Sequence, residues 1–257
     1  MRKFILAGLA LLLVPALALA GKTVTEGDNT LKIGATFDPA KASKSKQKLR
    51  STKASYDYVA GRTDNARLPD LRSVEVFMGG AKFGFAAFPT CDETDAAQQG
   101  DSVCDEDSLV GEGQATAEIH PPNDPTAKPD LPVEVKIYNG SLDTTEEGEP
   151  MEPRPGLLLY TEVAGEPVAL PFWAEKKNRQ VAYRNPDEDS DPETESLYTL
   201  KEVHLDFFKR SAKLNGKRIP FLALPTKCDK KWVVTTTNTY YEDDPLTAKH
   251  KVKCTKA

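Results

Sequence analysis

Three aspartates at alternate positions, Asp187, Asp189 and Asp191, are the part of this sequence that most resembles a metal-binding loop. Calcium is held by several carboxylate and carbonyl oxygens, and alternating acidic residues open the loop of an EF-hand. The sixth position of such a loop requires glycine but is Pro192, and the twelfth is Tyr198 rather than glutamate. We therefore exclude an EF-hand and keep an irregular calcium site as an alternative to a solvated acidic loop.

A second acidic region surrounds Cys91 and Cys104, where Asp101, Asp105 and Asp107 could form another irregular calcium site. The twelve residues between the cysteines exclude a thiol-disulfide catalyst, because such catalysts have only two residues between their cysteines. A zinc site would need further cysteines or histidines at ligand spacing, and the segment has none. We therefore interpret this region as a surface loop held by a disulfide.

The chain has four cysteines, the other two being Cys228 and Cys254. An even number of cysteines in an exported protein predicts two disulfides, and four cysteines allow three pairings. Pairing Cys91 with Cys104 and Cys228 with Cys254 is favoured because it closes short loops, whereas both alternative pairings close much longer ones. Each bridge would stabilise the fold by about 3 kcal/mol in the chain-entropy model.

The first twenty residues have the pattern of a signal peptide. Arg2 and Lys3 form a basic start, residues 4–17 are apolar, and residues 18–20 supply the small side chains that signal peptidase requires. The apolar run is short for a membrane span, and no stop-transfer pattern follows it. We expect cleavage before Gly21, a secreted and extracellular protein, and no transmembrane segment in the mature chain.

Catalytic residues are poorly supported by the sequence. No G-x-S-x-G or H-E-x-x-H pattern is present, and the surroundings of His120, His204 and His250 are typical of surface histidines. Paired carboxylates could serve a glycoside hydrolase, but the sequence does not reveal which of the 39 acidic side chains lie close in space. Trp173 and Trp232 could stack on sugars, although their apolar neighbours favour core packing. We assign no catalytic, cofactor-binding or metal-binding residue.

Charge is unevenly distributed along the chain. Residues 41–53 contain six basic and no acidic side chains, and residues 185–195 contain six acidic and no basic ones. Such runs are usually solvated loops, although the basic run could contact an anionic cell-wall polymer. Removal of the signal peptide changes the formal net charge from −5 to −7, so the whole chain offers no electrostatic case for binding nucleic acid or anionic lipid. The Asn139-Gly140-Ser141 sequon matters only in a source that glycosylates asparagine.

The elements that must position these residues are mostly β-strands. In residues 131–138 and 201–207 apolar and polar side chains alternate, as expected for strands with one buried face. Further strands are expected at residues 30–37, 54–61, 72–79, 113–120, 156–163, 168–175, 179–185, 218–224, 231–241 and 248–254. Asn215-Gly216 favours a two-residue hairpin turn, whereas Asn139-Gly140 is expected to end a strand.

This succession of strands, with no helix longer than about two turns, predicts an all-β fold. We expect an antiparallel β-sandwich, Ig-like or jelly-roll-like, that forms a single domain at residues 21–257 and carries two disulfides.

Several segments are similar to those of a known group of proteins: FPTC at 88–91, SVCDEDSLVGEG at 102–113, LPVEVKIYNG at 131–140, GLLLYTEV at 156–163, TLKEVHLDFF at 199–208, PFLALPTKC at 220–228 and the stretch from KWVVTTT to KVKC at 231–254. Together they resemble a group of uncharacterised secreted bacterial proteins, mostly from actinobacteria, over Leu31–Ala257. The resemblance implies a secreted all-β protein with Cys91–Cys104 and Cys228–Cys254 disulfides, and it implies no activity or substrate. Asp105, in place of an expected proline, and the acidic insert at 185–195 depart from it.

The leading functional hypothesis is a secreted, non-catalytic module with a structural or binding role at the cell surface or wall. Its partner would be a cell-wall polymer or a glycan. One alternative is a secreted hydrolase that acts on glycans. The other is a calcium-dependent adhesion module that uses the acidic loops.

Overall fold

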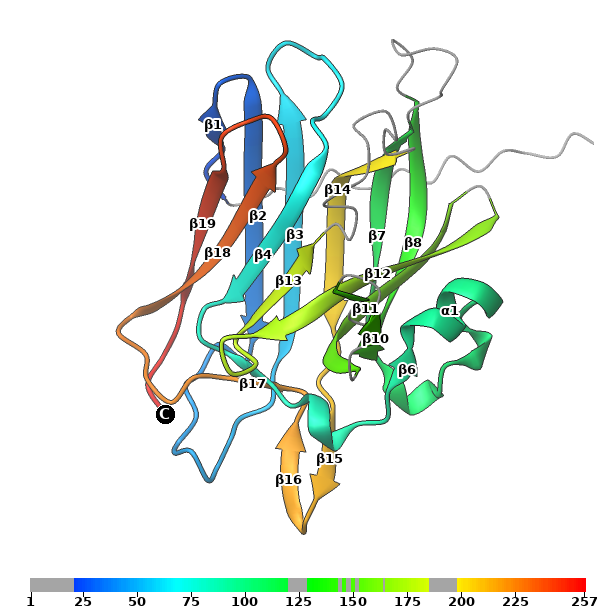
Figure 1. Cartoon of the computed structure of the whole chain (residues 1–257). Coiled ribbons are helices and arrows are strands. Elements are labelled where there is room, and N and C mark those ends of the chain that lie inside the picture. The colour runs from blue at the N-terminus through cyan, green and yellow to red at the C-terminus, as the bar shows by residue number, and fades with distance from the viewer. Residues whose placement is uncertain are drawn as a thin grey trace, which may run out of the picture.

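The structure, a computed structural model, describes residues 21–119, 129–142, 145–146, 149–150, 153–163, 165–184 and 198–257. One long antiparallel sheet contains most of the strands, and small two-stranded sheets and a short helix lie beside it (Figure 1). This arrangement confirms the all-β fold expected from the alternation of apolar and polar residues.

The long sheet has the strand order β1-β2-β3-β14-β7-β8-β11-β12-β13-β4-β18-β19, and β6 pairs with β8. Its strands are β1 (Val24–Glu26), β2 (Asn29–Asp38), β3 (Lys53–Arg62), β4 (Leu71–Met78), β6 (Cys91–Asp92), β7 (Leu109–Ile119), β8 (Asp130–Leu142), β11 (Arg154–Val163), β12 (Glu166–Glu175), β13 (Gln180–Arg184), β14 (Tyr198–Phe207), β18 (Lys231–Tyr240) and β19 (Leu246–Lys253). The smaller sheets pair β5 (Lys82–Phe83) with β17 (Leu222–Ala223), β9 (Thr145–Glu146) with β10 (Glu149–Pro150), and β15 (Ser211–Leu214) with β16 (Lys217–Pro220). The helical elements are α1 (Glu93–Gln99) and the short 3-10 turns η1 (Phe85–Ala87), η2 (Asp101–Val103) and η3 (Glu106–Ser108).

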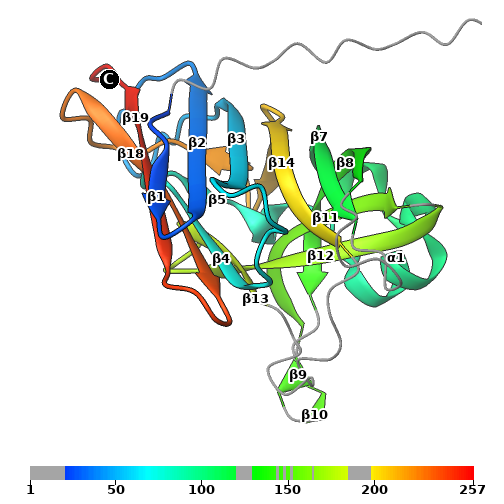
Figure 2. The ribbon, with the colours of Figure 1, turned by 90° about the horizontal axis from the view of Figure 1, so that it is seen from above.

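The long sheet is nearly closed, because β19 at one end lies beside β1 and β2 at the other (Figure 1, Figure 2). Its two halves therefore face each other across a shared interior, as in a sandwich. The hydroxyls of Tyr56 on β3 and Thr236 on β18 share a hydrogen bond of 2.7 Å, and Asn238 Nδ2 donates to the Tyr58 hydroxyl at 2.8 Å. All four side chains are buried, so hydrogen bonds as well as apolar contacts join the two halves.

Phenylalanine rings fill the core at the end of the molecule where β2 leads into β3 and β14 leads into β15. Phe221 is fully buried and packs edge-on against Phe83, Phe85 and Phe88, with ring centroids 5.9, 5.8 and 5.3 Å away. Such edge-to-face pairs add stability beyond the area that they bury. Residues 218–224, expected as one strand, divide into β16 and β17 at this ring.

Both disulfides have the expected sequential pairing. Cys91–Cys104, with its Cα atoms 4.8 Å apart, closes the segment that contains α1. Cys228–Cys254, with its Cα atoms 6.0 Å apart, joins the approach to β18 to the end of β19. None of the described helices has the length and hydrophobicity needed to cross a bilayer.

The expectation that Asn139-Gly140 ends a strand is wrong, because β8 continues to Leu142. Both residues stay in the ladder, where Asn139 is paired with Leu157 and Gly140 with Gly156 of β11. A Cβ atom at Gly140 would lie 2.5 Å from the Leu142 side chain. This glycine therefore serves close packing within a strand rather than a turn.

Candidate anion-binding site

Two basic segments that are distant in the sequence meet at one end of the molecule, which we call the basic end (Figure 1). It consists of residues 41–53, between β2 and the start of β3, and residues 209–218, which include most of the β15–β16 hairpin. The first segment contains six basic residues and the second contains five, with no acidic residue in either. The Ser51 hydroxyl donates to the Arg210 carbonyl at 3.2 Å, which joins the two segments directly.

The hairpin forms as its sequence predicts. Asn215 and Gly216 occupy positive φ angles of 51° and 74°, the backbone conformation that a two-residue type I′ turn requires. Asparagine and glycine tolerate that conformation better than other residues do. The turn places Lys217 and Arg218 on β16 opposite Leu214 and Lys213 on β15. Cations from both sides of the turn are thereby brought close together.

Buried hydrogen bonds fix the basic loop on the core. The Ser43 hydroxyl donates to the Leu224 carbonyl at 2.9 Å and accepts from the Arg50 backbone N–H at 2.9 Å. The Leu224 N–H donates to the Arg50 carbonyl at 3.0 Å, and the Ser43 N–H donates to the Pro225 carbonyl at 2.9 Å. Ser43 is only 1% exposed. The backbone of Arg50 is therefore held from both sides, although much of the surrounding loop is exposed.

A pocket of about 450 Å³ opens between the two basic segments. Its size is within the range of small-ligand sites. Its lining consists of three cations (Arg50, Lys209 and Arg218), two hydroxyls (Ser51 and Ser211) and three apolar side chains (Pro39, Leu49 and Pro220). The described residues of the lining include no carboxylate and no histidine, so the pocket could receive an anion.

The three cations of this pocket have no ion-pair partner among the residues that the structure describes. Neighbouring Arg210, by contrast, contacts Asp107 at 2.8 Å. Arg50 Nε is buried and has no hydrogen-bond partner in the part of the chain that the structure describes. Three cations without ion-pair partners among the described residues favour an arriving anion, because hydrogen bonds between charged groups are the strong ones.

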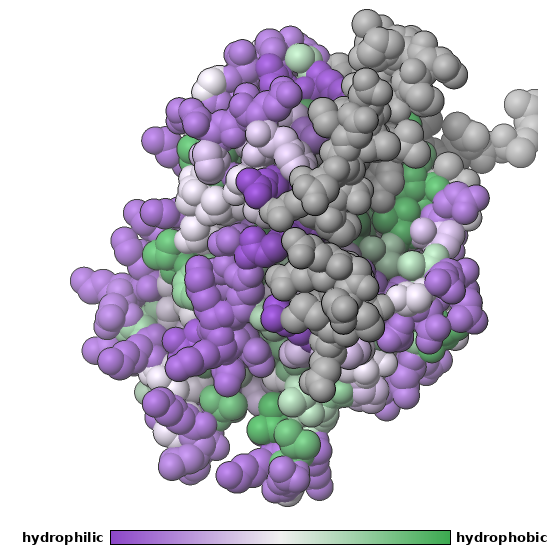
Figure 3. All heavy atoms as spheres, viewed as in Figure 1, coloured by the Kyte–Doolittle hydropathy of each residue, from purple (hydrophilic) through white to green (hydrophobic). Residues whose placement is uncertain are grey.

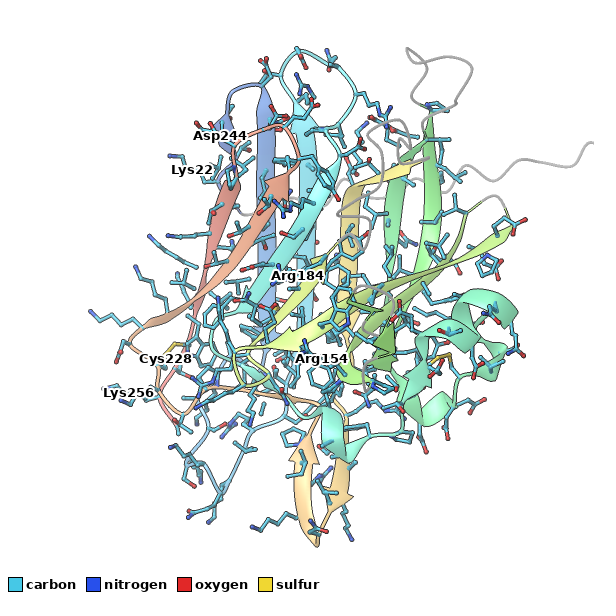
Figure 4. The ribbon with its side chains drawn as sticks, in the orientation of Figure 1. Lys22, Arg154, Arg184, Cys228, Asp244 and Lys256 are labelled. Atoms are coloured by element: carbon cyan, nitrogen blue, oxygen red, sulfur yellow. A yellow bond between two sulfur atoms is a disulfide. The ribbon has the colours of Figure 1, made fainter. Side chains whose placement is uncertain are left out.

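Acidic residues gather at the opposite end of the molecule. Arg62 at the end of β3 lies 2.7 Å from Asp64, 3.9 Å from Asp28 and 4.0 Å from Asp243. The hydrogen bond from Arg62 holds the pKa of the Asp64 carboxyl well below its usual range. Figure 4 labels Asp244 at this end, far from Lys256 beside the basic end. A cluster of acidic residues around Arg62 therefore lies far from the basic end, and the net charge of the whole chain does not describe the basic end.

The surface carries few large apolar side chains. On the face drawn in Figure 3 hydrophilic residues predominate, with small hydrophobic spots between them. Two of the exposed large apolar residues, Leu49 and Leu214, belong to the basic end and are 38% and 39% exposed. Single leucines among lysines do not form an extended apolar patch.

The aspartates of the calcium candidate near the first disulfide, Asp101, Asp105 and Asp107, each interact with a different partner. Asp101 accepts from the Tyr138 hydroxyl at 2.8 Å, Asp105 accepts from the Asp107 backbone N–H, and the Asp107 carboxylate pairs with Arg210. No group of three or more histidine, cysteine or acidic residues in the described part of the chain is arranged to hold a metal ion. The other candidate, Asp187, Asp189 and Asp191, lies outside the described residues.

The histidines that the structure describes do not face the pocket. His204 is on β14, with Nδ1 2.6 Å from Asp57 Oδ1 and Nε2 3.3 Å from Asp206 Oδ2. His250 is half-buried on β19. His120 lies outside the described residues.

The two tryptophans have different surroundings. Trp232 is buried in the main core, packs edge-on against Phe37 at 5.6 Å, and donates through Nε1 to the Lys227 carbonyl. Trp173 is half-buried and packs against a smaller apolar cluster that includes Cys91 and lies near α1. Trp232 therefore offers no stacking face to a sugar.

Asn139 of the sequon is fully buried on β8. Its Nδ2 donates to the carbonyl oxygens of Phe85, Phe88 and Pro89 at 3.2, 3.1 and 2.8 Å. In the folded protein this side chain joins β8 to the segment from Phe85 to Pro89, and it is inaccessible to glycosylation.

Three pocket residues, Lys209, Ser211 and Arg218, were not singled out from the sequence. Their signal was the stretch KRSAKLNGKR at 209–218, which is as free of acidic residues as the longer run at 41–53. Within this stretch, the Asn215-Gly216 pattern predicts a hairpin turn but does not show where the basic side chains lie in space.

Searches of protein-family models, of curated proteins and of solved structures found no match to this chain.

Proposed function

We propose that the protein is a secreted, non-catalytic binding module whose basic end binds an anionic polymer of the cell surface or wall. The observation that carries this proposal is the meeting of residues 41–53 and 209–218, with pocket cations that lack ion-pair partners among the described residues. A flexible anionic chain can follow such a surface and contact many cations at once.

The charge segregation supports a fixed orientation of binding. The Arg62 end carries Asp28, Asp64 and Asp243, so it is repelled by the polymer that attracts the basic end. The signal-peptide pattern at residues 1–20 and the two disulfides support a location outside the cytoplasm.

The test is a binding assay of the purified protein on immobilised polyanions. We expect retention on a poly(glycerol phosphate) matrix at low salt and elution as salt rises, because surface charge interactions are screened within about 10 Å at 0.1 M and about 3 Å at 1 M. A triple variant, Lys44→Gln, Lys46→Gln and Lys48→Gln, should elute at clearly lower salt, because all three side chains are exposed on the basic loop.

The matched control is the triple variant Lys22→Gln, Lys249→Gln and Lys251→Gln, which loses the same charge from exposed positions outside the basic end. It should elute close to the wild type. Equal shifts for both triples would contradict a localised site and indicate a net-charge effect. Binding only to vesicles of anionic phospholipid, with none to the polymer, would replace the polymer with a membrane as the partner.

A further inference from the structure

We propose that the pocket between the two basic segments is a phosphate-group site, which takes one phosphodiester of the polymer at Arg50. This inference rests on the proposed function and names the ligand chemistry of the same end of the molecule. It is carried by three cations, Arg50, Lys209 and Arg218, which line one pocket and form no ion pair with the residues that the structure describes.

The pocket is held in place before any ligand arrives. The Arg50 backbone is hydrogen-bonded to Ser43 and Leu224, and Ser51 is hydrogen-bonded to the Arg210 carbonyl. The Phe221 N–H also donates to the Arg210 carbonyl at 3.0 Å, so the second wall is tied to the buried phenylalanine cluster. A site whose walls are already ordered loses little conformational entropy on binding.

The donors suit a tetrahedral oxyanion better than a carboxylate. A guanidinium presents a planar fork of N–H groups that can bind two oxygens of one phosphate, and Lys209 and Arg218 supply two further charges. The Ser211 hydroxyl makes no hydrogen bond to the residues that the structure describes and is free to donate to a further oxygen. A phosphodiester has two unesterified oxygens and two ester oxygens, which offers more acceptors than one carboxylate.

The rest of the lining fits the carbon part of such a ligand. Pro39, Leu49 and Pro220 supply apolar surface beside the cations. The volume of about 450 Å³ exceeds what a bare phosphate ion fills, so the site has room for the polyol or sugar that bears the phosphate.

The test is a calorimetric titration of the purified protein at low ionic strength, once with inorganic phosphate and once with glycerol phosphate. Wild-type protein should bind both, and glycerol phosphate more tightly because it also contacts the apolar lining. Arg50→Gln should weaken binding of both probes by about tenfold or more, as expected for loss of a charged hydrogen-bond partner. Lys249→Gln, which removes the same charge from an exposed lysine outside the basic end, should change the affinity for either probe by less than about twofold.

Arg50→Lys keeps the positive charge but loses the planar fork of N–H donors in the guanidinium. It should therefore bind phosphate more tightly than Arg50→Gln but less tightly than the wild type. Ser211→Ala provides a second variant on the other wall, which keeps the test informative if Arg50→Gln is unstable. No phosphate binding by the wild type, or equal losses for Arg50→Gln and Lys249→Gln, would overturn the pocket as a phosphate site. Phosphate binding at Arg50 without retention on the polymer would uphold the pocket and contradict the proposed function.

Discussion

Asn139 illustrates how a single buried amide connects two parts of this fold. Its side chain leaves β8 and donates to three carbonyl oxygens between Phe85 and Pro89, in a segment with little regular structure of its own. Buried carbonyl groups need partners, and the Asn139 amide adds to the Phe88 N–H, which donates to the Phe85 carbonyl at 3.2 Å. The amide thus orders the residues that lead towards α1.

Replacing the Asn139 side chain should therefore reduce the stability of the protein by more than the small size of this side chain suggests. We expect Asn139→Ala to lower the free energy of unfolding by about 2–4 kcal/mol, because the Phe88 and Pro89 carbonyl groups lose the amide donor and the Phe85 carbonyl keeps only the Phe88 N–H. Urea denaturation measures this change. The exposed Gln114→Ala on neighbouring β7 should stay within about 0.5 kcal/mol of the wild type. A loss of similar size at both positions would contradict the role that we assign to Asn139.

At the scale of elements, each disulfide secures a different part of the sheet. Cys91–Cys104 encloses α1, whose first turn is capped by the Asp92 carboxylate. The helix has only seven residues, and such short helices are unstable without tertiary contacts. Cys228–Cys254 instead ties the two ends of the β18–β19 hairpin, beside the C-terminal residues that pair with the basic loop.

Removing each disulfide should consequently loosen a different element. The double variant Cys91→Ala and Cys104→Ala should lose about 3 kcal/mol and speed hydrogen exchange in residues 93–108, because the cross-link no longer restricts that loop. The matched variant Cys228→Ala and Cys254→Ala should leave exchange in α1 nearly unchanged. Fast exchange of α1 in both variants would show that the helix depends on global stability rather than on its own bridge.

At the scale of the whole molecule, closure of the sheet buries phenol groups between its halves. Burial is the main cause that raises the pKa of Tyr56 and of Tyr58 above the usual value near 10. The hydrogen bonds with Thr236 and Asn238 lower these pKa values but only partly offset the burial. Both phenols remain neutral in the folded state at pH values where unfolded tyrosines ionise.

Stability should therefore fall at alkaline pH. The pKa of each phenol is higher in the folded state than in the unfolded chain, so its contribution to stability is complete below about pH 10. Above that pH the contribution is lost, because the unfolded chain releases the phenol proton while the folded protein keeps it. The loss should approach about 1.4 kcal/mol per pH unit for each buried phenol. Denaturation of the double variant Tyr56→Phe and Tyr58→Phe between pH 9 and 11.5 should show a shallower decline. Tyr241→Phe, at a position 43% exposed, should decline like the wild type; a double variant that declines equally steeply would refute this cause.

Local patterns in the chain were sufficient to predict several features. Strict alternation in residues 131–138 and 201–207 predicts strands with one buried face, because the side-chain period of a strand is two. The Asn215-Gly216 turn and the pairing of neighbouring cysteines depend on conformational preference and loop closure, which are also local. The Asn139-Gly140 pattern was misleading, because tertiary packing kept that pair within β8.

The candidate site depends on contacts that no local pattern encodes. The sequence alone identifies residues 41–53 as a strongly basic run and predicts an all-β chain with two disulfides. The position of residues 209–218 against that loop, and of the acidic residues around Arg62 at the other end, becomes visible only in the folded chain. The reason is physical: β3 and β14 are adjacent in the sheet although more than a hundred residues separate them, so their basic flanking segments meet only once that pairing has formed.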